Sequence, residues 1–303
     1  MLNLAITLSL QLLTCILFGY LVNKFVPHNA KINKIIDDTI LYCLNPLLIF
    51  YSLWRMNEEI EVIAIIKFLS IPIIVVIFST LVAFVYSNVQ NKEFRDVCLP
   101  IIFMNSGYLA IPINTILFNV EGLAYANIYS IVVGVLQFTY GIYLVSHKGG
   151  VQLRIKGLKI TLWFLLFVFI GLVFNILNVE ADKKVVTFFA ILSKCVIYVL
   201  LAYIGYEIGA IKGKFDVLEG GTVIALRMFS GMFIAVVLTH ILCLSGALRG
   251  VAIISSSMPS AVTNYIIAEK FGCDKKLASE AIVGGTLAAF ILIPLIVYVL
   301  RLR

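Results

Sequence analysis

Hydrophobic residues fill long runs of this chain, and short polar connections separate those runs. A helix that crosses the hydrocarbon core of a bilayer needs about 20 mainly apolar residues. Because the connections are short, we expect one all-α polytopic membrane unit without a soluble domain. Runs of the required length predict ten membrane-spanning helices, at 4–25, 35–54, 62–86, 97–118, 123–146, 158–178, 185–211, 221–244, 248–271 and 277–300.

Two of these runs are interrupted by polar and helix-breaking residues, one in each half of the chain. The first interruption reads Asn105-Ser-Gly-Tyr-Leu-Ala-Ile-Pro112, and the second reads Ser257-Met-Pro-Ser-Ala-Val-Thr-Asn264. Backbone that is not helical at membrane depth is tolerated only inside protein or along a cavity. Interruptions at matching places in two halves are typical of the substrate site of a secondary transporter.

A weak internal repeat and the charge pattern predict the topology. Aligning Asn105 with Pro259 also aligns Leu123 with Leu277. Five spans per half is an odd number, so the second half would cross in the opposite direction and the repeats would be inverted. We expect repeats at 1–146 and 158–303, joined by a cytoplasmic connector at 147–157. Both termini would lie outside the cytoplasmic membrane, because lysine and arginine favour cytoplasmic loops and gather within 24–34, 92–95, 148–159, 212–214 and 270–276.

The composition excludes several other classes of protein. With 62% hydrophobic and 13% charged residues, the chain has too little polar surface to cover a water-soluble globule. Its net charge of +7 is spread over the connections, which fits contact with anionic membrane lipid and gives no reason to expect a nucleic-acid partner. The six cysteines occur singly and without close spacing, so we expect no metal site. No cofactor is expected either.

The residue types at the interruptions suit the binding of a small anion. Pro112 lacks a backbone donor, Gly107 permits backbone angles that other residues avoid, and Asn105 offers both amide donors and an acceptor. Half-helices that begin at the interruptions would direct their positive dipole ends at one point. A simple proline kink explains one such break, whereas two matched breaks flanked by polar residues favour a site.

The same residues resemble motifs of the auxin efflux carrier family, within the superfamily that also contains bile acid transporters. The first interruption resembles the Asn-x-Gly-x-x-Gly-x-Pro stretch of that family's fourth helix. Met258-Pro-Ser-Ala-Val-Thr-Asn-Tyr-Ile-Ile-Ala-Glu-Lys-Phe-Gly272 resembles its ninth-helix signature, and Asn45-Pro46 in the second span adds to the likeness. Ala110 stands where the pattern has Gly, and Asn264 stands where plant members carry a second Pro, so crossing geometry and substrate preference can differ.

The resemblance covers the whole chain and implies a fold, a mechanism and a site. The fold would cross broken spans 4 and 9 inside a transport domain, which moves against a scaffold domain by an elevator mechanism. The substrate would be an auxin-like weak acid or, as in bacterial malate and malonate permeases, another small carboxylate. The scaffold surface would face lipid or a second copy of the chain. The residues implied to bind substrate are Asn105, Ser106, Gly107, Pro112, Ser257, Met258, Pro259, Thr263 and Asn264, with Asn45 and Gln137 as weaker candidates.

Three alternatives compete with this interpretation. A sodium-coupled symporter of the bile acid type shares the crossed plan, but the interruptions contain no carboxylate before Glu269. An intramembrane enzyme would need a nucleophile with a base, or a metal set, and no such motif occurs. A channel would need a polar stripe along a continuous helix, and none is visible.

Elsewhere, Glu207 and Arg227 are expected to form an ion pair, and the glycines at 205, 209 and 213 predict close helix packing.

Overall fold

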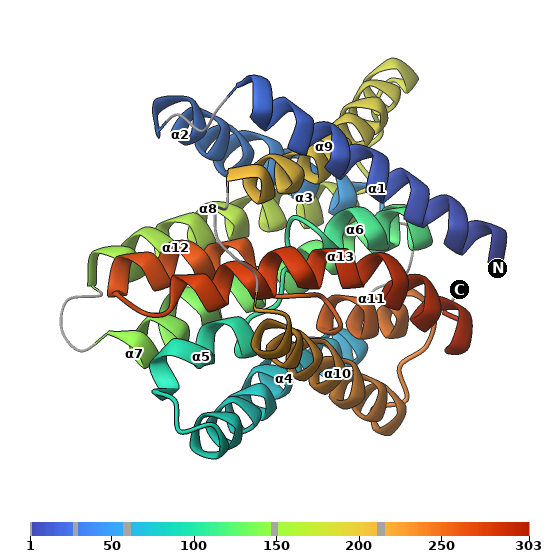
Figure 1. Cartoon of the computed structure of the whole chain (residues 1–303). Helices are drawn as coiled ribbons and strands as arrows, with labels where there is room; N and C mark the ends of the chain where they lie inside the picture. Colours follow the sequence, from blue (N-terminus) through green and yellow to red (C-terminus); the bar gives the residue numbers. More distant parts are fainter. Residues whose placement is uncertain (1, 27–29, 57–61, 147–150, 211–215, 303) are drawn as a thin grey trace.

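The computed structural model describes residues 2–26, 30–56, 62–146, 151–210 and 216–302 (Figure 1). All regular structure in these ranges is helical, apart from one isolated bridge between Met104 and Ser260. The predicted all-α class is therefore confirmed for the described residues. The elements are α1 (Leu2–Phe25), α2 (Ala30–Thr39), the π-helical turn η1 (Ile40–Leu44), α3 (Asn45–Trp54), α4 (Val62–Val89), α5 (Phe94–Ile102), α6 (Ala110–Leu136), the π-helical turn η2 (Gln137–Gly141), α7 (Ile142–Val145), α8 (Val151–Ile176), α9 (Lys183–Ala210), α10 (Val217–Ile241), α11 (Gly246–Ser256), α12 (Val262–Phe271) and α13 (Lys275–Val299).

Several helices meet the length and hydropathy that a membrane span requires. Among the described residues there are six, and Leu13–Phe25, Tyr42–Trp54 and Gly246–Ser256 form shorter apolar helices. The chain is therefore a multi-pass membrane protein. The six long helices are Ile63–Val89, Ala110–Val145, Gly157–Ile176, Lys183–Gly209, Leu218–Ile241 and Lys275–Val299. The predicted connector at 147–157 falls partly outside the described residues.

The longest of these helical runs, Ala110–Val145, changes direction at Asn119. Phe118 and Asn119 have non-helical backbone angles, and φ is 55° at Asn119. A Cβ atom at Gly122 would lie 2.1 Å from the carbonyl oxygen of Asn114, although a straight helix separates residues eight apart by about 12 Å. The run therefore folds back on itself near Asn119, where the sequence predicted that one span ends and the next begins.

The helices pack in two groups. In one group α1 packs along α9, and α3 packs on α8; in the other, α4 contacts α5 and α10, α11 contacts α6 and α10, and α13 contacts α10 and α12. In Figure 1 the first group lies toward the top and the second toward the bottom. Direct contacts between the groups include α1 with α13 and α3 with α6.

Glycines bring α1 and α9 into close contact. A Cβ atom at Gly19 would lie 1.7 Å from the carbonyl oxygen of Ala202, and one at Gly205 would lie 1.9 Å from that of Ile16. Small residues allow this approach of two membrane helices. The predicted packing role is confirmed for Gly205 and Gly209, whereas the glycine at 213 lies outside the described residues.

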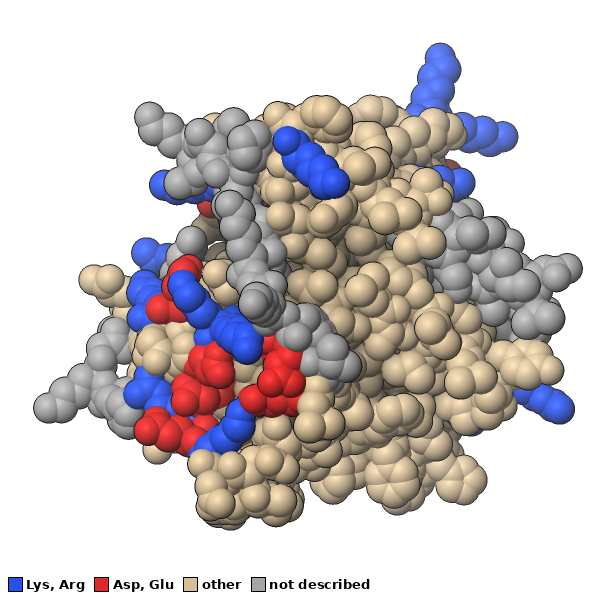
Figure 2. Space-filling model, viewed as in Figure 1, with Lys and Arg blue, Asp and Glu red and all other residues tan. Residues whose placement is uncertain are grey.

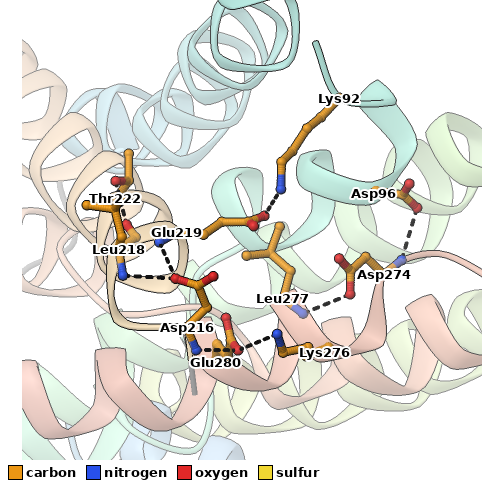
Figure 3. Close-up of polar contacts among 10 residues, drawn as sticks. All are labelled: Lys92, Asp96, Asp216, Leu218, Glu219, Thr222, Asp274, Lys276, Leu277 and Glu280. Atoms are coloured by element: carbon orange, nitrogen blue, oxygen red, sulfur yellow. Dashed lines mark hydrogen bonds and ion pairs between the residues drawn. The ribbon is translucent and has the colours of Figure 1, made fainter. Parts of the chain in front are cut away.

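Polar contacts join three helix starts at one end of the second group (Figure 3). Lys92, just before α5, pairs with Glu219 of α10, and the backbone N–H of Asp274, just before α13, donates to Asp96 of α5 at 3.0 Å. The backbone N–H of Asp216 donates to Glu280 of α13 at 2.8 Å. Figure 2 shows acidic and basic side chains gathered on one side of this view, next to a broad area of uncharged residues. These contacts hold α5, α10 and α13 together at this end.

Asp216 also caps α10 and should make stability depend on pH. Its carboxylate accepts from the N–H groups of Leu218 and Glu219, both at 3.1 Å. The bond from Glu219, then that from Leu218, lowers the pKa of Asp216 below its usual 3.8. Because the folded state has the lower pKa, the stabilisation is present above pH of about 3.8 and is lost as pH falls through the folded value.

We therefore expect Asp216→Ala to lower the midpoint of thermal unfolding at pH 7, since the cap is lost. Asp216→Asn is the matched control, because an asparagine also caps a helix, and it should stay close to the wild type. The measurement is a thermal melt of each purified protein between pH 3 and pH 7. Equal midpoints for all three proteins at pH 7 would contradict the assignment.

Candidate functional site

The two interrupted segments lie against each other in the structure. The backbone N–H of Asn105 donates to the carbonyl oxygen of Pro259 at 2.7 Å, and that of Ala261 donates to the carbonyl oxygen of Phe103 at 3.0 Å. These residues are buried, and the two bonds pair backbone groups that lie outside the helices. Each break thus supplies the hydrogen-bond partners that the other lacks, as backbone at membrane depth requires.

Asn264 adds a side-chain tie across the same contact. Its Nδ2 donates to the carbonyl oxygen of Phe103 and to Oγ of Ser260, both at 2.9 Å. Its Oδ1 accepts from Nε2 of Gln137 at 2.7 Å. Asn264 is fully buried, and its amide connects α12, the first break and the turn η2.

A cavity of about 500 Å³ lies beside this contact. Its wall includes residues of both breaks together with residues of α2, α3, α8 and α9, so the cavity lies between the two helix groups. The residues predicted from the sequence that line it are Asn45, Asn105, Ser106, Gly107, Gln137 and Thr263.

The other five predicted residues are buried and do not line the cavity. Ser257 donates from Oγ to the carbonyl oxygen of Ile253 at 2.6 Å, and Pro259 contributes its carbonyl to the first break. Pro112 lies in the first turn of α6 rather than in the break, where a missing N–H costs nothing. Met258 and Asn264 are fully enclosed.

Two residues that line the cavity each have a buried amide atom without a partner among the described residues. Nδ2 of Asn105 is unpartnered and buried, although Oδ1 of the same side chain accepts from the N–H of Leu109 at 3.3 Å. Oδ1 of Asn45 is also buried without a partner. An unsatisfied buried polar atom costs about 1–3 kcal/mol. A ligand that accepts a hydrogen bond from Asn105 would recover that cost.

Both π-helical turns adjoin the cavity. Asn45 follows η1 directly, and Gln137 is the first residue of η2. A π-helical turn inserts a residue into the helix and often marks a functional position. Here the two turns set the direction of two amide side chains at the wall.

Several lining residues were not predicted from the sequence. Tyr108 lies within the first break, and its ring lies 5.6 Å from that of Tyr203 on α9, centroid to centroid. Tyr203 lies on a continuous helix whose own pattern gives no sign of a site, and the tertiary arrangement brings it to the cavity. The polar members of this set are Lys34, Asp38, Tyr108, Ser130, Thr161, Tyr203, Glu207, Tyr265 and Glu269.

The predicted ion pair between Glu207 and Arg227 is wrong. Glu207 lines the cavity from α9, whereas Arg227 is fully buried in α10. Arg227 instead donates to backbone carbonyl oxygens of α5 and α11. The sequence showed two opposite charges at similar depth. It did not show that α9 directs Glu207 to the cavity while α10 directs Arg227 to the ends of α5 and α11.

A stability measurement without substrate tests whether the hydrogen bonds of Asn264 stabilise the fold independently of substrate binding. Asn264→Ala removes three hydrogen bonds and leaves buried groups unpaired, so we expect it to destabilise the protein by roughly 2–4 kcal/mol. The neighbouring Thr263→Ala, at the cavity wall, should change stability much less. Thermal melts in the absence of added carboxylates provide the comparison, and equal shifts for both variants would contradict the structural role.

Comparison with known proteins agrees with the motif analysis. A family model described as "Membrane transport protein" matches residues 163–298. A protein of Methanothermobacter thermautotrophicus named "uncharacterized transporter" is 23% identical over 295 residues, with 94% of this chain and 95% of that protein covered. An uncharacterized transporter of Methanocaldococcus jannaschii is 22% identical over 302 residues, covering 94% and 96%. These matches make the chain similar to membrane transporters over most of its length, in agreement with the resemblance of its two breaks to motifs of the auxin efflux carrier family.

Proposed function

We propose that this protein is a secondary active transporter that carries a small organic anion through the cavity between its two helix groups. The observation that carries the proposal is the contact of the two breaks at the wall of that cavity, where Nδ2 of Asn105 is buried and unpartnered. Polar groups fixed at the midpoint of broken membrane helices are the usual ligands in secondary transporters.

The charge of the substrate follows from the ends of the half-helices. α6 begins at Ala110 and α12 begins at Val262, and Gly107, Val262 and Thr263 line the cavity. A helix start carries about +0.5 of a charge, which favours an anion nearby. An anionic group near Asn105 would therefore meet two positive helix ends and an amide donor.

The rest of the wall favours one anionic group on an apolar body. Apart from residues at the breaks, the lining combines aromatic and aliphatic residues with polar and acidic ones, and Lys34 is its one basic member among the described residues. A second carboxylate, as in malate or malonate, would have few donors to meet it. We therefore place an aromatic or aliphatic monocarboxylate ahead of a dicarboxylate. The aromatic and aliphatic members of the wall are Tyr108, Ile131, Val133, Phe138, Ile160, Phe164, Tyr203, Val262, Tyr265 and Ile266.

We further propose ten spans arranged as two inverted repeats. α5 with Ala110–Phe118 would form the fourth span, and α11 with α12 would form the ninth. The part of α6 after Asn119, with η2 and α7, would form the fifth span. Repeats 1–146 and 158–303 then place both breaks at equivalent positions, and the basic connections place both termini outside the cytoplasmic membrane.

The two helix groups suggest how the substrate moves. α1, α2, α3, α8 and α9 would form a scaffold, and the remaining helices would carry the crossing segments and their cavity wall as one body. The polar contacts that join α5, α10 and α13 support rigid movement of this second body. Sliding of one group along the other would expose the cavity to the two sides in turn, as an elevator mechanism requires.

The sodium-coupled alternative lacks supporting contacts at the crossing. A sodium site there would draw on carboxylate oxygens near the breaks. Glu269 reaches the cavity from the far end of α12, and it already pairs with Lys275 at 3.0 Å. The hydrogen bonds described across the breaks come from amides, hydroxyls and backbone groups.

Replacement of Asn105 tests the proposal directly. We expect Asn105→Ala to abolish uptake of radiolabelled indole-3-acetate into proteoliposomes, because the substrate loses its amide donor, while membrane insertion is unchanged. Asn88→Ala removes an exposed asparagine of α4 and is the matched control, which should transport like the wild type. Transport by the Asn105 variant at the wild-type rate would remove this residue from the site.

A further inference from the structure

Arg227 of α10 contacts the ends of the two helices that precede the breaks, and it has no carboxylate partner among the described residues. Its side chain is the largest of those that are fully buried. Nη1 donates to the carbonyl oxygens of Ile101 at 2.9 Å and Ile102 at 2.6 Å, and to Oγ of Ser79 at 3.2 Å. Nη2 donates to the carbonyl oxygen of Ser256 at 3.0 Å. Such a charge needs compensation from its surroundings, because an uncompensated buried ion is very costly.

The compensation comes from helix ends. Ile101 and Ile102 are the last residues of α5, and Ser256 is the last residue of α11. Each helix C-terminus carries about −0.5 of a charge, so the two ends together offset one guanidinium. The fork of the guanidinium also allows a single side chain to reach both ends. Arg227 therefore joins the C-terminal ends of the two half-helices that precede the breaks.

This arrangement leaves an excess of positive charge where the two breaks meet. Four half-helix ends converge there, two negative ends of α5 and α11 and two positive ends of α6 and α12. Arg227 neutralises the negative pair, whereas no described acidic side chain contacts it from the neighbouring helices α4, α5 and α11. Ile102 stands only two residues before Met104, which lines the cavity. In a medium of low dielectric constant, charges act on one another more strongly than in water.

We propose that Arg227 is a positioning and specificity-determining residue, which gives the site its preference for anions without touching the substrate. It holds the two half-helix ends in register and cancels their negative charge, so that the positive ends of α6 and α12 dominate at the cavity. The inference rests on the proposed function in one respect, namely that the substrate is an anion.

The packing around Arg227 leaves room for its hydrogen bond to Ser256. Gly231 lies one turn further along α10, and a Cβ atom there would lie 2.1 Å from Nη2 of Arg227 and 2.1 Å from the carbonyl oxygen of Ser256. Glycine at this position therefore allows α10 to approach α11 closely enough for the bond. Gly221, on the same helix, has no neighbouring atom within 4 Å of a Cβ, and Gly221→Ala is a matched control.

The test compares binding of an acid and its uncharged amide. The probes are indole-3-acetate and indole-3-acetamide, and their apparent affinities come from thermal-shift titrations of the purified full chain. The quantity of interest is the ratio of the two affinities, which a purely structural role of Arg227 would not change. Arg227→Lys keeps the charge and should keep the ratio within about threefold of the wild type. Arg227→Gln loses the charge and should reduce the ratio at least tenfold.

The outcomes separate the inference from the proposed function. A folded Arg227→Gln protein with the wild-type ratio would overturn the inference and leave the transport of anions intact. A wild type that does not distinguish the acid from the amide would overturn the anion assignment itself. If Arg227→Gln does not fold, Gly231→Ala replaces it. That variant displaces the guanidinium and should reduce the ratio at least threefold, whereas Gly221→Ala should not, and equal ratios in the two glycine variants would overturn the inference.

Discussion

Every backbone N–H and C=O group that leaves a helix inside a membrane must find a partner within the protein. This protein meets the requirement by placing its two broken segments against each other. Asn105 and Ala261 exchange backbone hydrogen bonds with Pro259 and Phe103, and the amide of Asn264 closes the same contact from the side. The breaks are stable only together, so the position of each half of the chain is tied to that of the other.

The same constraint creates the candidate functional site. Pairing of the breaks fixes where α5 and α11 end and where α6 and α12 begin. The negative ends are directed to Arg227, while residues beside the positive ends line the cavity. Nδ2 of Asn105, a residue of that wall, has no partner among the described residues. Contact between the breaks alone leaves this donor unsatisfied, whereas the proposed anionic ligand would accept its hydrogen bond.

Much of the fold could be predicted because each span needs a long apolar run. The predicted run at 62–86 corresponds to α4 at Val62–Val89, and the run at 277–300 corresponds to α13 at Lys275–Val299. The first break was placed slightly late: α6 already begins at Ala110 and accommodates Pro112 in its first turn, since the N–H that proline lacks has no helical partner there.

The site was predictable only where local sequence reports it. Asn105 and Thr263 stand out because polar residues beside a break are unusual in an apolar run, and both line the cavity. Tyr203 gives no such signal, because it lies within the continuous helix α9 and reaches the site through packing alone. Arg227 was visible as a charge within a span, but its partners include backbone carbonyls over 120 residues away, which no sequence pattern marks.

The most direct test of the account is a thermal-shift measurement on the purified protein with malate, malonate, succinate, indole-3-acetate and taurocholate, each in sodium and in potassium buffer. A ligand that binds the folded state alone raises its apparent stability by mass action. An anion site at the crossed breaks predicts stabilisation by a carboxylate, with indole-3-acetate ahead of the dicarboxylates, to the same extent in both buffers. Stabilisation by sodium alone, with no effect of any carboxylate, would contradict it.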